Sequence, residues 1–273
     1  MRRETFKAPE SLTVDISNAA GEIEVEATET DEAVVELEPL RSNDASERAV
    51  EEATVELRGS RLVVDVEDRS FFGLSLNVNR EVRVAVRVPR GTGVVVAGAS
   101  ADIALRGPLG DAQVKTASGD VNGDRLEGDV RLKSASGDAK LDHVIGAADV
   151  QSASGDVSFG RVDGDARIRT ASGDVNVIDA RAGVNVQTAS GDQRIEAVAQ
   201  GRVDLKSASG DILVGVRRGS RVWLDVRSLS GDAESELDVA DTPVDEEGPL
   251  VELTAMSMSG DIRVERAEAI SQA

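Results

Sequence analysis

The sequence predicts an all-β protein, a single-stranded parallel β-solenoid with about 18 residues per coil divided into two nine-residue half-turns. The first observation is the triplet Ser-Gly-Asp, which begins at residues 118, 136, 154, 172, 190, 209, 230 and 259. The first four steps between these triplets are 18 residues long, and the later steps are 19, 21 and 29. The second observation is a glycine at every ninth residue from Gly119 to Gly173. Apolar and polar residues alternate between these glycines, which is typical of half-buried strands.

The nine-residue frame predicts where each side chain points. Seven alternating residues form a strand, and two residues form the corner that follows. In one such half-turn, Gly137 points inward, Ser136 and Asp138 point outward from the strand, and the corner falls at Asp142-His143. An inward glycine would let the two sheets of a flattened solenoid approach closely.

Residues 1–97 are predicted to form a strand-rich N-terminal cap, because an open solenoid end would pair with other strands. Alternating strands are expected at residues 11–17, 22–27, 33–38, 54–58, 61–67 and 80–88. One short helix is expected near residues 44–53, with Asp44 or Ser46 as its N-cap. Phe71 and Phe72 form the most apolar point of this segment, either as cap packing or as an exposed partner contact.

The regular repeats are expected at residues 98–218, followed by irregular C-terminal coils at 219–273. An acidic insertion at 232–249 lies between the last two triplets, as a solvated loop or a cation or partner site. The triplet at residue 259 is expected to close the last coil. Trp223 is expected to pack beneath this C-terminal end.

Stacked coils turn the outward positions into rows, which are the candidate partner face and candidate cation site. The serine row contains Ser118, Ser136, Ser154, Ser172, Ser190 and Ser209, and the aspartate row contains Asp120, Asp138, Asp156, Asp174, Asp192 and Asp211. Neighbouring carboxylates at the spacing of stacked strands repel by roughly 1 kcal/mol in water. Hydrogen bonds to serine hydroxyls or solvent, with nearby Arg and Lys, would offset this repulsion. Alternatively the row recruits cations, or contacts a protein or a glycan.

A specific calcium site is not expected from this pattern. Calcium-binding β-rolls carry Gly-Gly-x-Gly-x-Asp, in which glycine-rich corners bend around the ion. Here each Asp directly follows its Gly and is expected within a strand, so no cage forms, although cation binding along the row stays open. No cofactor is predicted.

No catalytic residue is predicted either. His143 is the only histidine and is expected to be a solvated turn residue, and no serine differs from its equivalents in the other coils. The sequence has one Trp, four Phe and no Tyr, which argues against the aromatic groove of a polysaccharide-cleaving enzyme. There is no Cys, so thiol chemistry is excluded.

A formal net charge of −20 argues against nucleic acid and anionic membranes as partners. The N-terminus has no apolar run typical of a signal peptide, and no stretch of 18 apolar residues could insert into a membrane. These features predict a cytoplasmic protein, with the cell surface as the alternative if the sequence is truncated. Self-association through an uncovered end of the solenoid stays open.

The repeat Thr/Ser-Ala-Ser-Gly-Asp-Val-x-Val at 116–121, 170–177 and 206–214 resembles a bacterial β-strand-repeat family of unknown function known as "putative adhesins". The resemblance implies a right-handed β-helix and assigns no binding or catalytic residue. We therefore expect a non-enzymatic scaffold or adhesin-like binding module that presents its Ser/Asp face to a partner. A calcium-dependent adhesin is the alternative, and a β-helical enzyme acting on polysaccharide is a third hypothesis.

Overall fold

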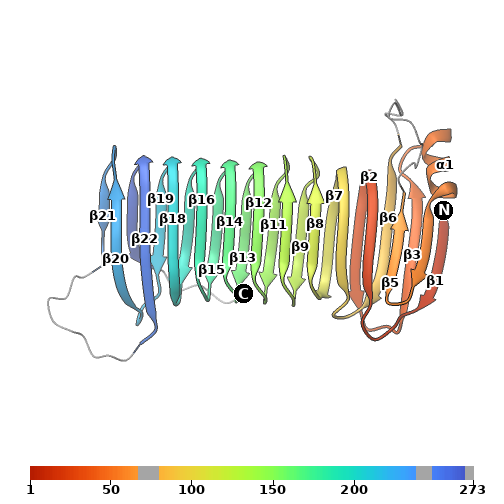
Figure 1. Ribbon diagram of the computed structural model, residues 1–273, viewed down its shortest axis with the longest axis horizontal. Helices are drawn as coiled ribbons and strands as arrows, with labels where there is room; N and C mark the ends of the chain where they lie inside the picture. Colours follow the sequence, from red (N-terminus) through yellow and green to blue (C-terminus); the bar gives the residue numbers. More distant parts are fainter. Residues whose placement is uncertain (67–79, 238–247, 268–273) are drawn as a thin grey trace. The chain divides into compact units, whose positions relative to one another are not determined.

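The computed structural model describes residues 1–66, 80–237 and 248–267 (Figure 1). The chain divides into two compact units, Met1–Asp138 and Ala139–Ala273. Both units are built from parallel strands that wind into coils, as the sequence predicts, and the first unit also carries an antiparallel region with one helix.

The first unit begins with strands that pair in both directions. Its strands are β1 (Arg2–Lys7), β2 (Thr13–Thr28), β3 (Glu32–Pro39), β4 (Thr54–Arg58), β5 (Arg61–Asp65), β6 (Val82–Pro89), β7 (Gly93–Leu109), β8 (Ala112–Thr116), β9 (Val121–Leu126) and β10 (Val130–Ser134). The pairs β1–β3, β3–β6 and β4–β5 are antiparallel, whereas β2 pairs in parallel with β5, β6 and β7. The antiparallel strands therefore lie around the long strand β2, which joins them to the coils.

The predicted helix is α1 (Asp44–Glu52), but its N-cap differs from the prediction. Asn43 caps the helix, with its Oδ1 accepting a hydrogen bond of 2.7 Å from the Ser46 backbone N–H. Asp44 and Ser46 were wrong as cap candidates, because both lie within the helix. Ser46 is fully buried, and its hydroxyl accepts a hydrogen bond from the Glu81 backbone N–H.

The second unit consists of coils. Its strands are β11 (Ala139–Val144), β12 (Ala148–Ser154), β13 (Val157–Val162), β14 (Ala166–Ser172), β15 (Val175–Ala180), β16 (Val184–Ser190), β17 (Gln193–Val198), β18 (Gly201–Ser209), β19 (Ile212–Val216), β20 (Arg221–Ser228), β21 (Ala233–Ser235), β22 (Leu250–Ser259) and β23 (Ile262–Arg266). The register confirms the predicted coil length: Val157 pairs with Val175, 18 residues later, and Val184 pairs with Val203, 19 residues later.

Aliphatic side chains fill the space between the two sheets of each coil. Val150, Ile168, Val186 and Leu205 occupy one inward row of the second unit, and all four are fully buried. Gln193 is an exception, because it is polar but occupies an inward position and is only 1% exposed. Its Nε2 donates hydrogen bonds of 2.8 Å to the Thr188 hydroxyl and the Lys206 carbonyl, whereas its buried Oε1 has no hydrogen-bond partner among the described residues.

The last coils are stacked out of sequence order, which corrects the expectation that the triplet at residue 259 closes the last coil. Strand β22 lies between β18 and β20, and strand β23 lies between β19 and β21. The coil formed by β20 and β21 is therefore the outermost coil of the second unit, although it comes earlier in the chain (Figure 1).

The Ser-Gly-Asp triplets form corners, whereas the sequence frame placed them within strands. Strand β12 ends at Ser154 and β13 begins at Val157, so Gly155 and Asp156 lie between the two strands. The predicted corner at Asp142-His143 is wrong, because both residues belong to β11.

Candidate functional site

In every triplet after the first, the glycine turns the chain with a backbone conformation that other residues rarely adopt. Gly137, Gly155, Gly173, Gly191, Gly210, Gly231 and Gly260 all have φ between 115° and 152°. A Cβ atom on Gly191 would also overlap the carbonyl oxygen of Gly173 in the neighbouring coil. Glycine is therefore required at the corner both by its φ angle and by the close stacking of the coils.

The aspartate of each triplet connects its coil to the next one. In the second unit, Oδ1 of Asp156 accepts a hydrogen bond of 2.8 Å from the backbone N–H of Asp174, and Asp174 in turn accepts one of 2.8 Å from Asp192. The series continues through Asp211, Asp261 and Asp232, at 2.8, 2.8 and 2.9 Å. In the first unit, Asp102, Asp120 and Asp138 form the same arrangement at 3.2 and 2.9 Å. We call these residues the aspartate ladder.

The ladder explains how like charges are tolerated at close spacing. The sequence suggested serine hydroxyls, Arg or Lys as the partners, but the observed donor is the backbone N–H of the next aspartate. A charged acceptor strengthens such a hydrogen bond. All ladder aspartates are exposed, so a carboxylate that accepts the N–H of the next corner still faces solvent.

The predicted serine row also lies at these corners, with its side chains exposed. Ser118 and Ser136 belong to the first unit, and Ser154, Ser172, Ser190 and Ser209 belong to the second. Sequence reasoning missed the Thr or Ser two positions before this serine, whose hydroxyl can hydrogen-bond to the backbone of the corner. Thr170, for example, is only 6% exposed and donates to the Ser172 carbonyl at 2.9 Å. The signal was the Thr or Ser that precedes every Ala-Ser-Gly-Asp.

The ladder is not arranged as a metal cage. Across residues 1–66, 80–237 and 248–267, no group of three or more His, Cys, Asp or Glu side chains could hold a metal ion. The ladder carboxylates instead follow one another along the stack and, apart from the terminal Asp232, bond to backbone N–H groups of neighbouring coils where the hydrogen bonds are resolved. Phe71, Phe72 and most of the acidic insertion, residues 238–247, lie outside the described residues.

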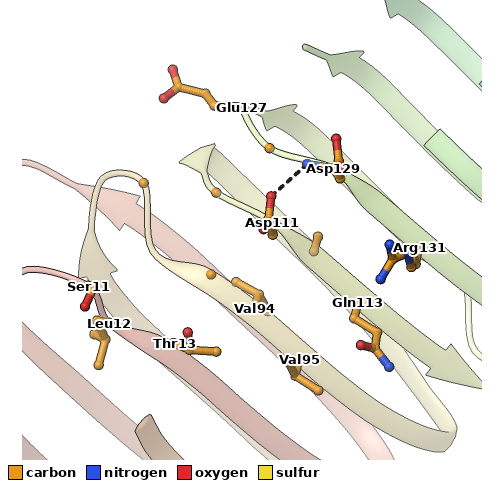
Figure 2. A pocket seen from close by; sticks show the side chains of 15 residues that line it. Ser11, Leu12, Thr13, Val94, Val95, Asp111, Gln113, Glu127, Asp129 and Arg131 are labelled. Atoms are coloured by element: carbon orange, nitrogen blue, oxygen red, sulfur yellow. Dashed lines mark hydrogen bonds between the residues drawn. The ribbon is translucent and has the colours of Figure 1, made fainter. Parts of the chain in front are cut away.

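A second set of aspartate corners was not recognised from the sequence. Oδ1 of Asp111 accepts a hydrogen bond of 2.9 Å from the Asp129 backbone N–H, at one side of an open depression of about 660 Å³ (Figure 2). Glycines line its floor, and Arg131 and Gln113 lie along its side. The signal for these corners was Gly-Asp followed by Ala or Val, at residues 110–112 and 128–130. The depression offers polar contacts and no histidine, nucleophile–base pair or cofactor cradle.

His143 differs from the prediction of a solvated turn residue. Its Nε2 lies 2.9 Å from Oδ2 of Asp163, and both side chains are about one quarter exposed. Arg161 donates from Nε to Oδ1 of the same carboxylate at 2.7 Å. Burial would raise the pKa of Asp163, but the hydrogen bonds from Arg161 and His143 outweigh it and hold this pKa below its usual value. The cluster is structural: Arg161 and Asp163 form an ion pair, and the contact of His143 with Asp163 joins neighbouring coils.

Several exposed cations gather on one sheet without an acidic partner. Lys115 on β8 lies beside Lys133 on β10, and Gln113 lies beside Arg131. In the second unit, Arg167 and Arg169 occupy the equivalent rows on β14. None of these five basic side chains forms an ion pair within the described part of the chain. We call this set the basic strip, and the ladder corner borders it in each unit.

Three solved structures are similar to this chain to different degrees. A crystal structure of a "putative lipid binding protein" from Parabacteroides distasonis is 14% identical, covers 96% of both chains and has a TM-score of 0.55. A "putative adhesin" from the same species is 12% identical over 96% of both chains, with a TM-score of 0.49. A "putative adhesin" from Bacteroides fragilis is 14% identical over 96% of both chains, with a TM-score of 0.40. No curated protein matches the chain.

The first of these structures shows that this coil architecture, with its N-terminal strand region, exists in a solved protein of similar length. Within the described residues, no helix is long and apolar enough to cross a membrane. The sequence profile of the Toastrack DUF4097 family matches residues 12–265, which include the repeated coils and almost all of the N-terminal strands. The chain therefore belongs to the Toastrack DUF4097 family.

Proposed function

We propose that this chain is a non-enzymatic, adhesin-like binding module that contacts its partner through regularly spaced rows of side chains. The observation that carries the proposal is the aspartate ladder, which ties successive corners within each unit to one another through hydrogen bonds of 2.8 to 3.2 Å. Exposed Ser and Asp side chains are thereby held in register over many coils. A rigid, pre-ordered surface loses little conformational entropy when a partner binds.

The charge pattern of this surface favours a partner with both acidic and basic groups, as a protein surface has. The basic strip supplies Lys115, Arg131 and Lys133 in the first unit and Arg167 and Arg169 in the second. The ladder supplies a parallel acidic row at the neighbouring corner. Complementary charges on a partner would fix its register along the coils more than they would add affinity.

Three other functions have less support. The calcium-dependent alternative would need carboxylates that converge, whereas ladder carboxylates such as those of Asp156 and Asp174 follow one another along the stack and bond to backbone N–H groups. An enzyme acting on polysaccharide would need a groove with paired carboxylates and aromatic walls. The depression beside Asp111 is open, and no aromatic residue lines it. The name of the Parabacteroides protein mentions lipid, but the inward rows here are filled by aliphatic side chains.

The proposal is tested by screening the full chain against panels of immobilised bacterial surface proteins and glycans, with two row variants. The first replaces Asp174, Asp192 and Asp211 by Asn, which keeps the Oδ1 acceptor and removes the charge. The second replaces Arg167 and Arg169 by Ser. A genuine ligand should lose affinity by about tenfold or more, about 1.4 kcal/mol, in at least one variant.

A matched control replaces Asn122 and Lys140, which are exposed on the opposite sheet, by Ser. This control should bind as the native chain does. A screen in which every ligand binds the row variants and the native chain equally would contradict the proposal. Turnover of a glycan in the screen would instead favour the enzyme hypothesis.

A further inference from the structure

Exposed apolar side chains concentrate at the outermost coil of the second unit. The residue before the serine of each triplet is an exposed alanine in the earlier coils, at 117, 135, 153, 171, 189 and 208. In the last two coils of the stack this position becomes Met258, which is 60% exposed, and Leu229, which is 81% exposed. Trp223, expected to pack beneath the end, is 56% exposed on the outer strand β20. The repeat therefore changes from small to large apolar residues where the stack ends.

The outermost coil also leaves its core partly uncovered. Val222, Leu224 and Val226 on β20 are half-buried, whereas their register partners on β22 are completely buried. Within the described residues, β20 pairs only with β22, and β21 pairs only with β23. Each strand thus has one edge without a hydrogen-bonded neighbour, and such edges readily pair with another chain.

We propose that this outer coil is a homodimer interface, with a second copy of the chain as its occupant. The two copies are related by a two-fold axis parallel to the strands. Strand β20 of one copy then lies antiparallel to β21 of its partner, because β20 runs toward the Ser-Gly-Asp corner and β21 runs away from it. In this arrangement the three residues of β21 pair with the end of the partner's β20 that lies nearest the corner.

Charge and apolar contact both select this two-fold axis. Arg227 lies just before the corner on β20, where it contacts Asp225 at 2.9 Å, and Glu234 lies just after the corner on β21, 3.6 Å from Arg263. The axis places each Arg227 beside the partner's Glu234, so these two ion pairs would extend into a network across the interface. The same rotation brings the two Leu229 side chains together at the corner, flanked by Met258. A two-fold axis perpendicular to the sheets would instead pair β20 with the partner's β20. It would bring Arg221 of one copy near Arg227 of the other and place the two Leu229 side chains far apart.

One opposing interaction limits the strength of this interface. Asp232 is the last member of the ladder, and no described residue donates a hydrogen bond to its carboxylate. The axis brings the two Asp232 carboxylates near each other, which repels the copies. The end of a single coil is also a small surface. We therefore expect a reversible dimer with a dissociation constant on the order of 10 µM or weaker.

Sedimentation equilibrium of the full chain over a range of concentrations tests the proposal. The expected result is a mass that rises with concentration from the 28.6 kDa of one chain toward twice that value. Leu229→Asp should raise the dissociation constant by about tenfold or more, because the charge replaces an apolar contact. The matched control is Ala171→Asp, which places the same charge at the equivalent corner of an inner coil and should leave association unchanged. Circular dichroism melts establish that both variants fold.

Charge exchange tests which strands pair. Arg227→Glu should weaken the dimer, and adding Glu234→Arg in the same chain should restore it. Failure of this second change to restore the dimer would overturn the pairing of β20 with β21. A chain that stays monomeric at every concentration, or a dimer that Leu229→Asp leaves unchanged, would overturn the interface itself. Failure here leaves the row-dependent binding proposed above unaffected, because the two tests change different residues.

Discussion

At the scale of single residues, the corner glycines and ladder aspartates have distinct structural roles. The glycine provides a positive φ angle and leaves space for the carbonyl group of the next coil. The aspartate accepts the N–H that the turn leaves without a strand partner. The two roles act on different atoms, so substitutions at the two positions should have separable effects.

Gly191→Ala should lower the free energy of unfolding by about 2 kcal/mol or more, because alanine is strained at a φ of 133° and its Cβ overlaps the Gly173 carbonyl. Urea unfolding followed by circular dichroism measures this change. Gly98→Ala is the control, since its Cβ would meet its nearest neighbour, the Asn18 carbonyl oxygen, at 3.5 Å. Equal stability of the two variants would contradict the role assigned to the corner glycine.

Replacing Asp174 separates the hydrogen bond of the ladder from its charge. Asp174→Ala removes the acceptor of the Asp192 N–H and should cost about 1 kcal/mol. Asp174→Asn keeps an Oδ1 acceptor and relieves repulsion along the row, so it should be at least as stable as the native chain. Thermal melts of the two variants measure the difference. A stable alanine variant would show that the ladder bond contributes nothing.

The pH dependence of stability should depend on Asp163. Its folded-state pKa is held below the usual value, so its ion pairs stabilise the chain above the unfolded-state pKa. This stabilisation is lost as the pH falls through the lowered folded-state pKa. Asp163→Asn should therefore be less stable than the native chain at neutral pH, with a gap that narrows on acidification. Urea unfolding from neutral pH to about pH 3 measures it.

Asp142→Asn is the control for this experiment. Asp142 is exposed, and its carboxylate lies 3.9 Å from the Lys140 amine, a looser contact than those of Asp163. The gap between Asp142→Asn and the native chain should be small at every pH. A difference in unfolding free energy between Asp163→Asn and the native chain that stays constant across this pH range would contradict the role assigned to Asp163.

At the scale of elements, the strands of the N-terminal region were predictable where one face is buried. The alternation at 54–58 and 33–38 gave strands close to β4 and β3, and the helix was found within one residue. Strand β1 was missed, because Arg2–Lys7 alternates partly exposed and exposed residues without a buried row. The corners were misplaced because an exposed Ser and Asp around a glycine continue the alternation of a strand, and periodicity carries no information on φ.

Asn43→Ala should destabilise the first unit by about 1 kcal/mol, because the Ser46 N–H loses its cap. The control is Glu52→Ala at the other end of α1, where removing an acid from the last turn should be neutral or slightly stabilising. Urea unfolding distinguishes the two. The cap was mispredicted because Asn43, Asp44 and Ser46 are all good capping residues, and only the observed backbone angles identify the one outside the helix.

At the scale of the whole molecule, a net charge of −20 opposes folding through repulsion among carboxylates. Moderate NaCl should therefore raise the melting temperature by screening that repulsion. CaCl₂ at matched ionic strength should raise the melting temperature by the same amount as NaCl. Adding a chelator at constant ionic strength should leave the melting temperature unchanged. A calcium-specific rise that chelator reverses would support the cation-dependent alternative instead.

The coil length and the two-sheet architecture followed directly from the 18-residue repeat. The order of the last coils could not be predicted, because the triplets at 230 and 259 are chemically equivalent and either could lie beside the coil of Asp211. The same equivalence prevented any single serine or aspartate from being assigned a special role. The candidate surface was thus predictable as a set of rows, whereas its hydrogen bonds depend on the backbone turn.

The insertion of β22 and β23 beneath β20 and β21 has a consequence for biosynthesis. A solenoid whose coils stack in sequence order can add each coil as the ribosome delivers it. Here the segment of β20 and β21 emerges before the strands on which it rests. It can reach its final place only after β22 and β23 have been translated, so the last coils assemble in an order that differs from their order of synthesis.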